Sequence, residues 1–165
     1  MAYQILDPVV GSQPIANTET SAKHPLGRIV KAQDPVLGAG EFIYLLGVAS
    51  TVVGSVVTYD ASTFQTVLSA VGGNIPRPIA IAMSANVGTQ YGWYQIAGVA
   101  VVGKQCTVSL AAGAAVGVLS TGLIAGTATG KEIEGAAVAA VASATAGRTT
   151  VKVMLSRPFK QGRIT

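Results

Sequence analysis

The feature that most constrains the fold is the segment of residues 79–103, IAIAMSANVGTQYGWYQIAGVAVVG, in which larger apolar side chains alternate with small ones. Ile79 and Ile81 alternate with alanines, which is the period-two pattern of a β-strand with one packed face. Residues 86–90, NVGTQ, interrupt the pattern and predict a turn in which Gly88 is free to adopt a positive φ. The segment therefore predicts two or three strands joined by tight turns.

The second half of this segment divides its large side chains between two faces of the expected strand. Tyr91, Trp93 and Gln95 point to one face. The opposite face carries Gly92, Tyr94 and Ile96. The segment holds the only tryptophan of the chain and no carboxylate, histidine or cysteine. We therefore expect it to pack, because aromatic side chains supply large contact area, and not to react.

Several other short segments have the composition of strands bounded by glycine turns. We expect them at residues 41–48, 51–57, 64–68, 105–110, 115–120 and 149–155. Short strands at intervals of about ten residues predict a mainly β protein, a sandwich or a barrel. Residues 133–146 are alanine-rich and fit either a short helix or a strand flanked by turns, and both alternatives stay open.

Three regions are expected along the chain. Prolines punctuate residues 1–35 and disfavour a central strand there, so this region is interpreted as an extended N-terminal arm, with terminal disorder as the alternative. Residues 36–156 are expected to form the β domain. Residues 157–165, RPFKQGRIT, are expected to form a basic C-terminal tail that is only partly ordered.

The low content of charge suggests that the surface is covered in an assembly. Charged residues make up 11% of the chain, against about 25% in typical domains. We infer that copies of the chain or a larger assembly cover part of the surface. The net charge of +4 comes from cations concentrated near both ends. We do not expect nucleic acid as a partner, because no aromatic stacking residues are interleaved with those cations.

A membrane segment is not expected, although residues 105–130 carry no charge and are long enough to span a bilayer. Serine, threonine and glutamine residues interrupt this stretch, and it lacks an aromatic belt. The N-terminal residues MAYQILDPVVG also lack the basic region and apolar core of a signal peptide.

Groups that could perform catalysis are sparse. Between Asp60 and Glu132 the chain contains no aspartate, glutamate or histidine, whereas catalysis needs paired groups within reach of one another. Cys106 is interpreted as a small buried side chain and His24 as a surface residue. We therefore expect no enzymatic activity, no catalytic residues, no cofactor and no metal site.

The chain resembles the decoration proteins, also called cement or head-stabilising proteins, that coat the capsids of tailed bacteriophages. The resemblance rests on the proline-rich N-terminal region, IYLLGVASTVVGSVVTYD, RPIAIAMS followed by YGWYQIAGVAVV, the long Gly/Ala/Val stretch and the closing TTVKVML, and it covers most of residues 36–156. It implies a compact β domain, β-barrel-like or β-tulip-like, that forms trimers or dimers on a capsid. The family has no catalytic residues to carry over.

The function expected from the sequence is therefore that of a structural virion protein, made in the host cytoplasm, that binds the outer capsid surface and stabilises the shell. Its expected partners are the major capsid protein and itself, as a homotrimer or homodimer. Trp93 fits a core role as well as an interface role, and both stay open. The candidate contact residues are Ile5, Leu6, Val9, Ile15, Tyr91, Trp93 and Tyr94.

The alternatives are another structural role, a small apolar ligand-binding domain and an inner-shell protein that binds nucleic acid. The other structural roles are a capsid, tail or fibre module of a phage, or a surface-layer protein.

Overall fold

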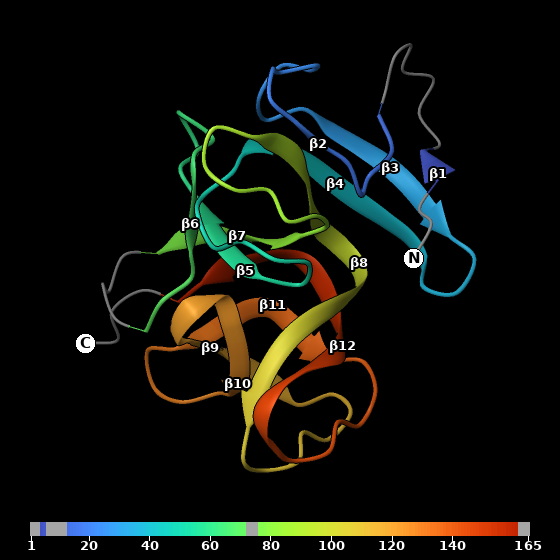
Figure 1. The fold of residues 1–165 in the computed structure, drawn as a ribbon. Coiled ribbons are helices and arrows are strands. Elements are labelled where there is room, and N and C mark those ends of the chain that lie inside the picture. Colours follow the sequence, from blue (N-terminus) through green and yellow to red (C-terminus); the bar gives the residue numbers. More distant parts are fainter. Residues whose placement is uncertain (1–3, 6–12, 72–75, 162–165) are drawn as a thin grey trace.

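The computed structural model describes residues 4–5, 13–71 and 76–161, and this part of the chain is built almost entirely from β-strands (Figure 1). The mainly β fold predicted from the sequence is confirmed. The strands are β1 (Gln4–Ile5), β2 (Thr18–Glu19), β3 (Ile29–Asp34), β4 (Gly38–Leu46), β5 (Val56–Tyr59), β6 (Thr66–Leu68), β7 (Arg77–Ala82), β8 (Tyr91–Cys106), β9 (Ala115–Leu119), β10 (Leu123–Gly126), β11 (Glu132–Val138) and β12 (Thr145–Lys160). A 3₁₀ helix, η1 (Ser120–Gly122), links β9 to β10.

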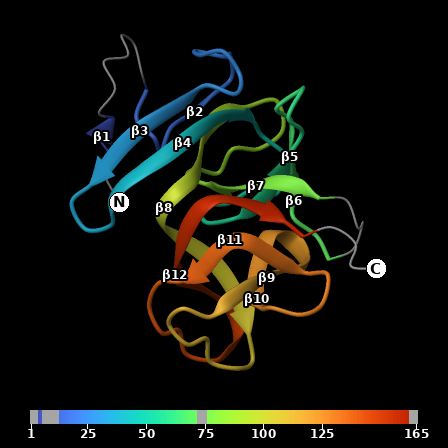
Figure 2. The same cartoon turned by 180° about the vertical axis from the view of Figure 1, so that it is seen from behind.

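Strand β8 is the element on which the others are arranged. Its first half pairs with β4, and its second half pairs with β12. Through β8, β10, β9, β11 and β12 the pairing returns to β8, so these five strands close a ring, although not a regular barrel. Figures 1 and 2 show the ring at one end of the molecule and β1, β3 and β4 at the other, with β8 running through both.

A bend at Gly98 allows the first half of β8 to pair with β4 and its second half to pair with β12. Gly98 has φ +90°, and a Cβ atom at this position would lie 2.3 Å from the carbonyl oxygen of Ala39. The register between β4 and β8 also shifts between Glu41 and Phe42, which marks a β-bulge. Bulges bend a strand and increase its twist, so the direction change of β8 follows from this glycine and this bulge.

The core consists of three apolar clusters. One fills the ring and includes Val102, Val118 and Val153. The other two lie on opposite faces of the β4–β8 pair, one around Trp93 and one around Tyr94. The predicted division of side chains between the two faces of β8 is confirmed, because Trp93 and Tyr94 belong to different clusters.

The prediction of an extended arm is wrong for residues 13–35. Strand β3 lies in this region and pairs with β4 along its whole length. Its side chains alternate between exposed and buried, with Val30 and Ala32 inside. Pro25 and Pro35 flank β3 and do not prevent pairing, since a proline outside a strand removes no ladder hydrogen bond. The predicted boundary at residue 36 therefore falls in the turn between two paired strands, β3 and β4. Residues 1–3 and 6–12 of the predicted arm lie outside the described residues.

The predicted C-terminal boundary also falls inside a strand. β12 continues through Lys160, whose Nζ donates a hydrogen bond to the carbonyl of Ala70 at 3.1 Å. Arg157 has φ +45° and marks a local distortion of β12. The described part of the predicted tail, residues 157–161, therefore belongs mainly to the β body.

Three local predictions are settled by the same structure. Residues 133–146 form no helix, since they contribute to β11 and to a loop in which Ala142 bridges Leu110. The strand expected over residues 105–110 contributes only its first two residues to β8. In the turn before β8 the positive φ belongs to Thr89, at +65°, and not to Gly88.

Candidate functional site

The N-terminal candidates for partner contact are only partly described. Leu6 and Val9 lie outside the described residues, and Ile5 is placed only as a backbone position in β1. Ile15 is 2% exposed and packs in the cluster that contains Val30 and Trp93. The structure therefore places Ile15 in the core, where it is not available as a surface contact.

The aromatic candidates of β8 are mainly core residues. Trp93 and Tyr94 are fully buried, and Tyr91 is half-buried. The Trp93 ring lies 5.0 Å from that of Tyr44 and 5.3 Å from that of His24, measured between ring centroids. Of the two alternatives left open for Trp93, the structure supports the core, and the interface assignment of Trp93 and Tyr94 is wrong for the folded chain.

His24 is buried rather than on the surface as predicted. It is 6% exposed and packs edge-on to Tyr44, with ring centroids 5.2 Å apart. Burial, and secondarily the charge of Arg28, lower the pKa of His24 below its ordinary value. Its Nε2 has no hydrogen-bond partner among the described residues, which is consistent with a neutral imidazole that stabilises the packing of residues 13–28.

The carboxylates of Asp34 and Asp60 stabilise turns by accepting backbone hydrogen bonds. Asp34 Oδ1 accepts hydrogen bonds from the backbone N–H groups of Val36 and Leu37, at 2.8 and 2.9 Å. Asp60 accepts the backbone N–H groups of Thr63 and Ser62, which lower its pKa. These are Asx-type turns. Among the residues that the structure describes, no three histidine, cysteine, aspartate or glutamate side chains are grouped so that they could hold a metal ion.

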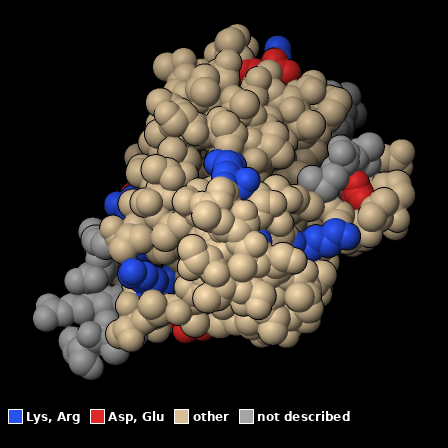
Figure 3. Space-filling model, turned by 60° about the horizontal axis from the view of Figure 1, so that its bottom comes forward, with Lys and Arg blue, Asp and Glu red and all other residues tan. Residues whose placement is uncertain are grey.

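The outer face of the ring carries apolar side chains that the fold itself does not cover. Met154 of β12 is 49% exposed and lies opposite Val99 of β8 and Ala137 of β11. One step along the ladder, Val101 lies opposite Lys152. We call Val99, Val101, Ala137 and Met154 the outer patch. On the face drawn in Figure 3, charged groups are few and widely separated.

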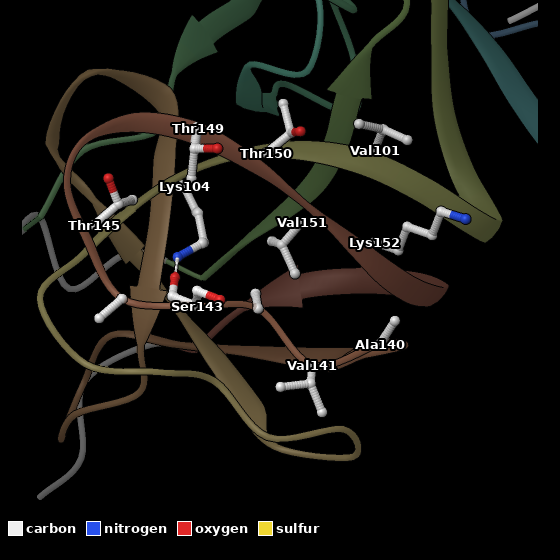
Figure 4. A pocket seen from close by; sticks show the side chains of 12 residues that line it. Val101, Lys104, Ala140, Val141, Ser143, Thr145, Thr149, Thr150, Val151 and Lys152 are labelled. Atoms are coloured by element: carbon white, nitrogen blue, oxygen red, sulfur yellow. Dashed lines mark hydrogen bonds between the residues drawn. The ribbon is translucent and has the colours of Figure 1, made fainter.

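Next to the outer patch, the wall of the ring has an opening. Ala139 donates its N–H to the carbonyl of Lys152, after which residues 140–144 diverge from β12 as a loop. The resulting pocket has a volume of about 550 Å³ and lies between this loop and residues 149–152, with Val101 and Lys104 of β8 completing its lining (Figure 4). The β8–β12 register shifts between Thr145 and Thr149 at this point, so the bulge accounts for the opening.

Lys104 lies at the inner side of this pocket. On β8 it follows Ala100 and Val102 on the face that points into the ring, and it is only 1% exposed. Its Nζ donates a hydrogen bond to the carbonyl of Ser143 in the loop (Figure 4). We name this cavity the Lys104 pocket. Sequence reasoning missed it, although the alternation of Ala100, Val102 and Lys104 placed a lysine on a core face.

The Lys104 pocket is apolar and cationic. Its walls are formed mainly by alanine, valine and threonine residues, and both charged residues that line it, Lys104 and Lys152, are cations. Lys104 is nearly inaccessible, whereas Lys152 is exposed. No carboxylate lines the pocket, so its electrostatic potential favours an anion.

In the described part of the chain, no helix has the length and apolar character needed to cross a lipid bilayer. No protein-family model matches the sequence, and no curated protein matches it either.

Proposed function

We propose that the chain is a structural virion protein of the decoration or cement type, which binds the outer surface of a bacteriophage capsid and stabilises the shell. The observation that carries the proposal is the outer patch, an apolar strip on the sheet in which Met154 is exposed and Val99, Val101 and Ala137 are partly exposed. The sequence resemblance to capsid decoration proteins supports the same function. The major capsid protein is the proposed partner, and the capsid surface the proposed location.

The physical reason is the free energy of burying this face. Contact with a partner removes apolar surface from water, which contributes about 25 cal/mol per Å². Met154 of the outer patch would lose solvent contact, as would Val141, which lines the adjoining pocket and is 73% exposed. A modest contact repeated at many equivalent positions of a shell raises the total work needed to rupture it.

The second proposed partner is another copy of the chain, in a homotrimer or homodimer. Contiguous apolar side chains that remain partly exposed, as in the outer patch, are typical of a protein that associates. Light scattering after gel filtration measures the native mass directly. A stable dimer or trimer supports self-association, and a monomer restricts the outer patch to contacts with the capsid.

The proposed function is tested with capsid shells that lack this protein. The purified chain is mixed with the shells, and the bound fraction is measured by sedimentation. We expect saturable binding, weakened at least tenfold by Met154→Glu, because a charge in an apolar contact must be desolvated. Val36→Glu, at a position that is 79% exposed in the β3–β4 turn, is the matched control. Failure of the wild-type chain to bind the shells would overturn the proposal.

A further inference from the structure

We propose that the Lys104 pocket receives the carboxylate of an acidic side chain from the protein on which the chain sits. This inference deepens the proposed function, since it names the chemistry by which a partner is recognised beside the outer patch. It rests on the burial of Lys104, the hydrogen bond that its ammonium group donates to Ser143 and the charge of the pocket lining.

The ammonium group of Lys104 has more donors than the acceptors around it use. A lysine ammonium carries three N–H donors. The hydrogen bond that the structure places on Nζ goes to the carbonyl of Ser143, a neutral acceptor. Burial of a cation is costly unless an anion or several acceptors compensate for the lost water. Lys104 takes part neither in the ion pair of Arg77 with Asp60 nor in that of Arg157 with Glu41.

The lining of the pocket suits a carboxylate on an aliphatic stem. Val101, Val141 and Val151 provide apolar walls for methylene groups. Thr149 contributes a hydroxyl at the ladder position opposite Lys104. Lys152 also lines the pocket, and its side chain extends away from Lys104 toward the outer side of the opening. The volume of about 550 Å³ falls within the range of about 300–1,000 Å³ for pockets that enclose ligands.

A protein carboxylate fits these features better than a nucleic-acid backbone. Binding of nucleic acid relies on a row of cations that follows successive phosphates, together with aromatic side chains for unpaired bases. The pocket offers two lysines, one of them recessed, and no aromatic lining residue. It also adjoins the outer patch through Val101, so an apolar contact and an acidic anchor would come from one partner surface.

The first experiment uses the isolated full-length chain and a small probe, so it does not depend on capsid shells. N-acetylglutamate is titrated into isotope-labelled protein and followed by NMR, with N-acetylglutamine as the uncharged comparison. We expect saturable shifts at the Lys104 side chain and at the amides of residues 141–144 and 149–152, with glutamate and not with glutamine. Shifts spread over all surface lysines, or equal shifts with both probes, would overturn the inference. Tighter binding of a DNA oligonucleotide at the same residues would overturn it as well.

Two variants assign the effect to this site. Lys104→Met removes the ammonium group at similar volume and should weaken binding of N-acetylglutamate at least tenfold, whereas Lys23→Met, at an exposed lysine outside the pocket, should not change it. If Lys104→Met does not fold, Val141→Asp provides the test, because this rim position is exposed and the new carboxylate should compete with the probe. Val141→Asn is its uncharged control. Unchanged binding by folded Lys104→Met, or by Val141→Asp, would overturn the inference.

A final comparison with shells separates the two proposals. If wild-type chain binds shells and Lys104→Met binds at least tenfold more weakly, both are supported. If the two bind shells equally, the pocket is not the contact and this inference fails while the proposed function stands. If the probe binds at Lys104 but wild-type chain does not bind shells, the proposed function fails and the carboxylate site remains.

Discussion

Arg157 of β12 and Glu41 of β4 form an ion pair, in which Nε and Nη2 of Arg157 lie 3.1 and 3.0 Å from the same carboxylate oxygen of Glu41. The pair links β12 to β4 beside the bend of β8. The side chain of Arg157 is 66% exposed, and that of Glu41 is 24% exposed. Water and salt therefore screen much of the attraction.

Removing this ion pair should have a small effect on stability. We expect Glu41→Gln to lower the free energy of unfolding by no more than about 1 kcal/mol. The measurement is urea denaturation at low and high salt, and the difference from wild type should shrink at high salt. A loss several times larger, independent of salt, would show that Glu41 has another structural role.

Trp93→Ala should destabilise the whole domain. Trp93 is completely buried between Tyr44 and His24, and truncation of a buried large aromatic residue costs about 3–5 kcal/mol. Chemical denaturation measures the loss, and Trp93→Phe, which keeps most of the apolar volume, should lose less. A fully stable Trp93→Ala variant with impaired association would instead identify Trp93 as an interface residue.

The bend of β8 predicts a difference between two glycines. Gly98 and Gly113 both have a positive φ, but only at Gly98 does a Cβ atom clash with a neighbouring backbone, since nothing lies within 4 Å of a Cβ at Gly113. Gly113→Ala should cost about 1–2 kcal/mol through backbone conformation alone. Gly98→Ala should cost clearly more, because the clash with Ala39 is added. Equal losses in thermal denaturation would contradict the role assigned to the bend.

The buried His24 should make stability depend on pH near neutrality. Its pKa is lower in the folded protein than the ordinary value of 6.5, so the unfolded state binds more protons as the pH falls. The stabilisation is complete above pH 6.5 and is lost progressively as the pH falls through the folded pKa. Denaturation curves between pH 8 and pH 5 should show this decline.

His24→Gln is the control for that pH dependence, because it removes the titrating group. The informative quantity is the change of its free energy of unfolding with pH, which should be smaller than that of wild type between pH 8 and pH 5. The carboxyl of Asp60, whose pKa is also lowered in the folded state, loses its contribution in a separate and more acidic window. An unchanged slope in His24→Gln would show that another group titrates.

Local periodicity was sufficient to predict the faces of the strands but not their length or pairing. The alternation around Trp93 and Tyr94 placed them correctly on opposite faces of β8. The bend at Gly98 depends on Ala39, and the ladder of β8 with β12 joins residues about fifty positions apart. No local pattern carries such information, because it arises from tertiary packing.

The candidate site was predicted less well than the fold, for a related reason. The aromatic residues of β8 were candidates for an interface and for the core alike, because the contact area that they supply favours both, and Trp93 lies in the core. The outer patch consists of valine, alanine and methionine residues that look like ordinary strand residues. Lys104 was missed as well, although the alternation of Ala100, Val102 and Lys104 along the strand was a signal that could have found it.

The closed ring also determines when this chain can complete its folding relative to its translation. The ring is completed only when β12 pairs with β8 and β11, so it cannot form until residues 145–160 have left the ribosome. Until then Val153 is not in place, and the apolar side chains inside the ring, including Val102 and Val118, lack part of their packing. Pairing between distant strands is slow, and such incomplete chains are prone to aggregate. Native folding of the ring is therefore a step that follows translation of β12.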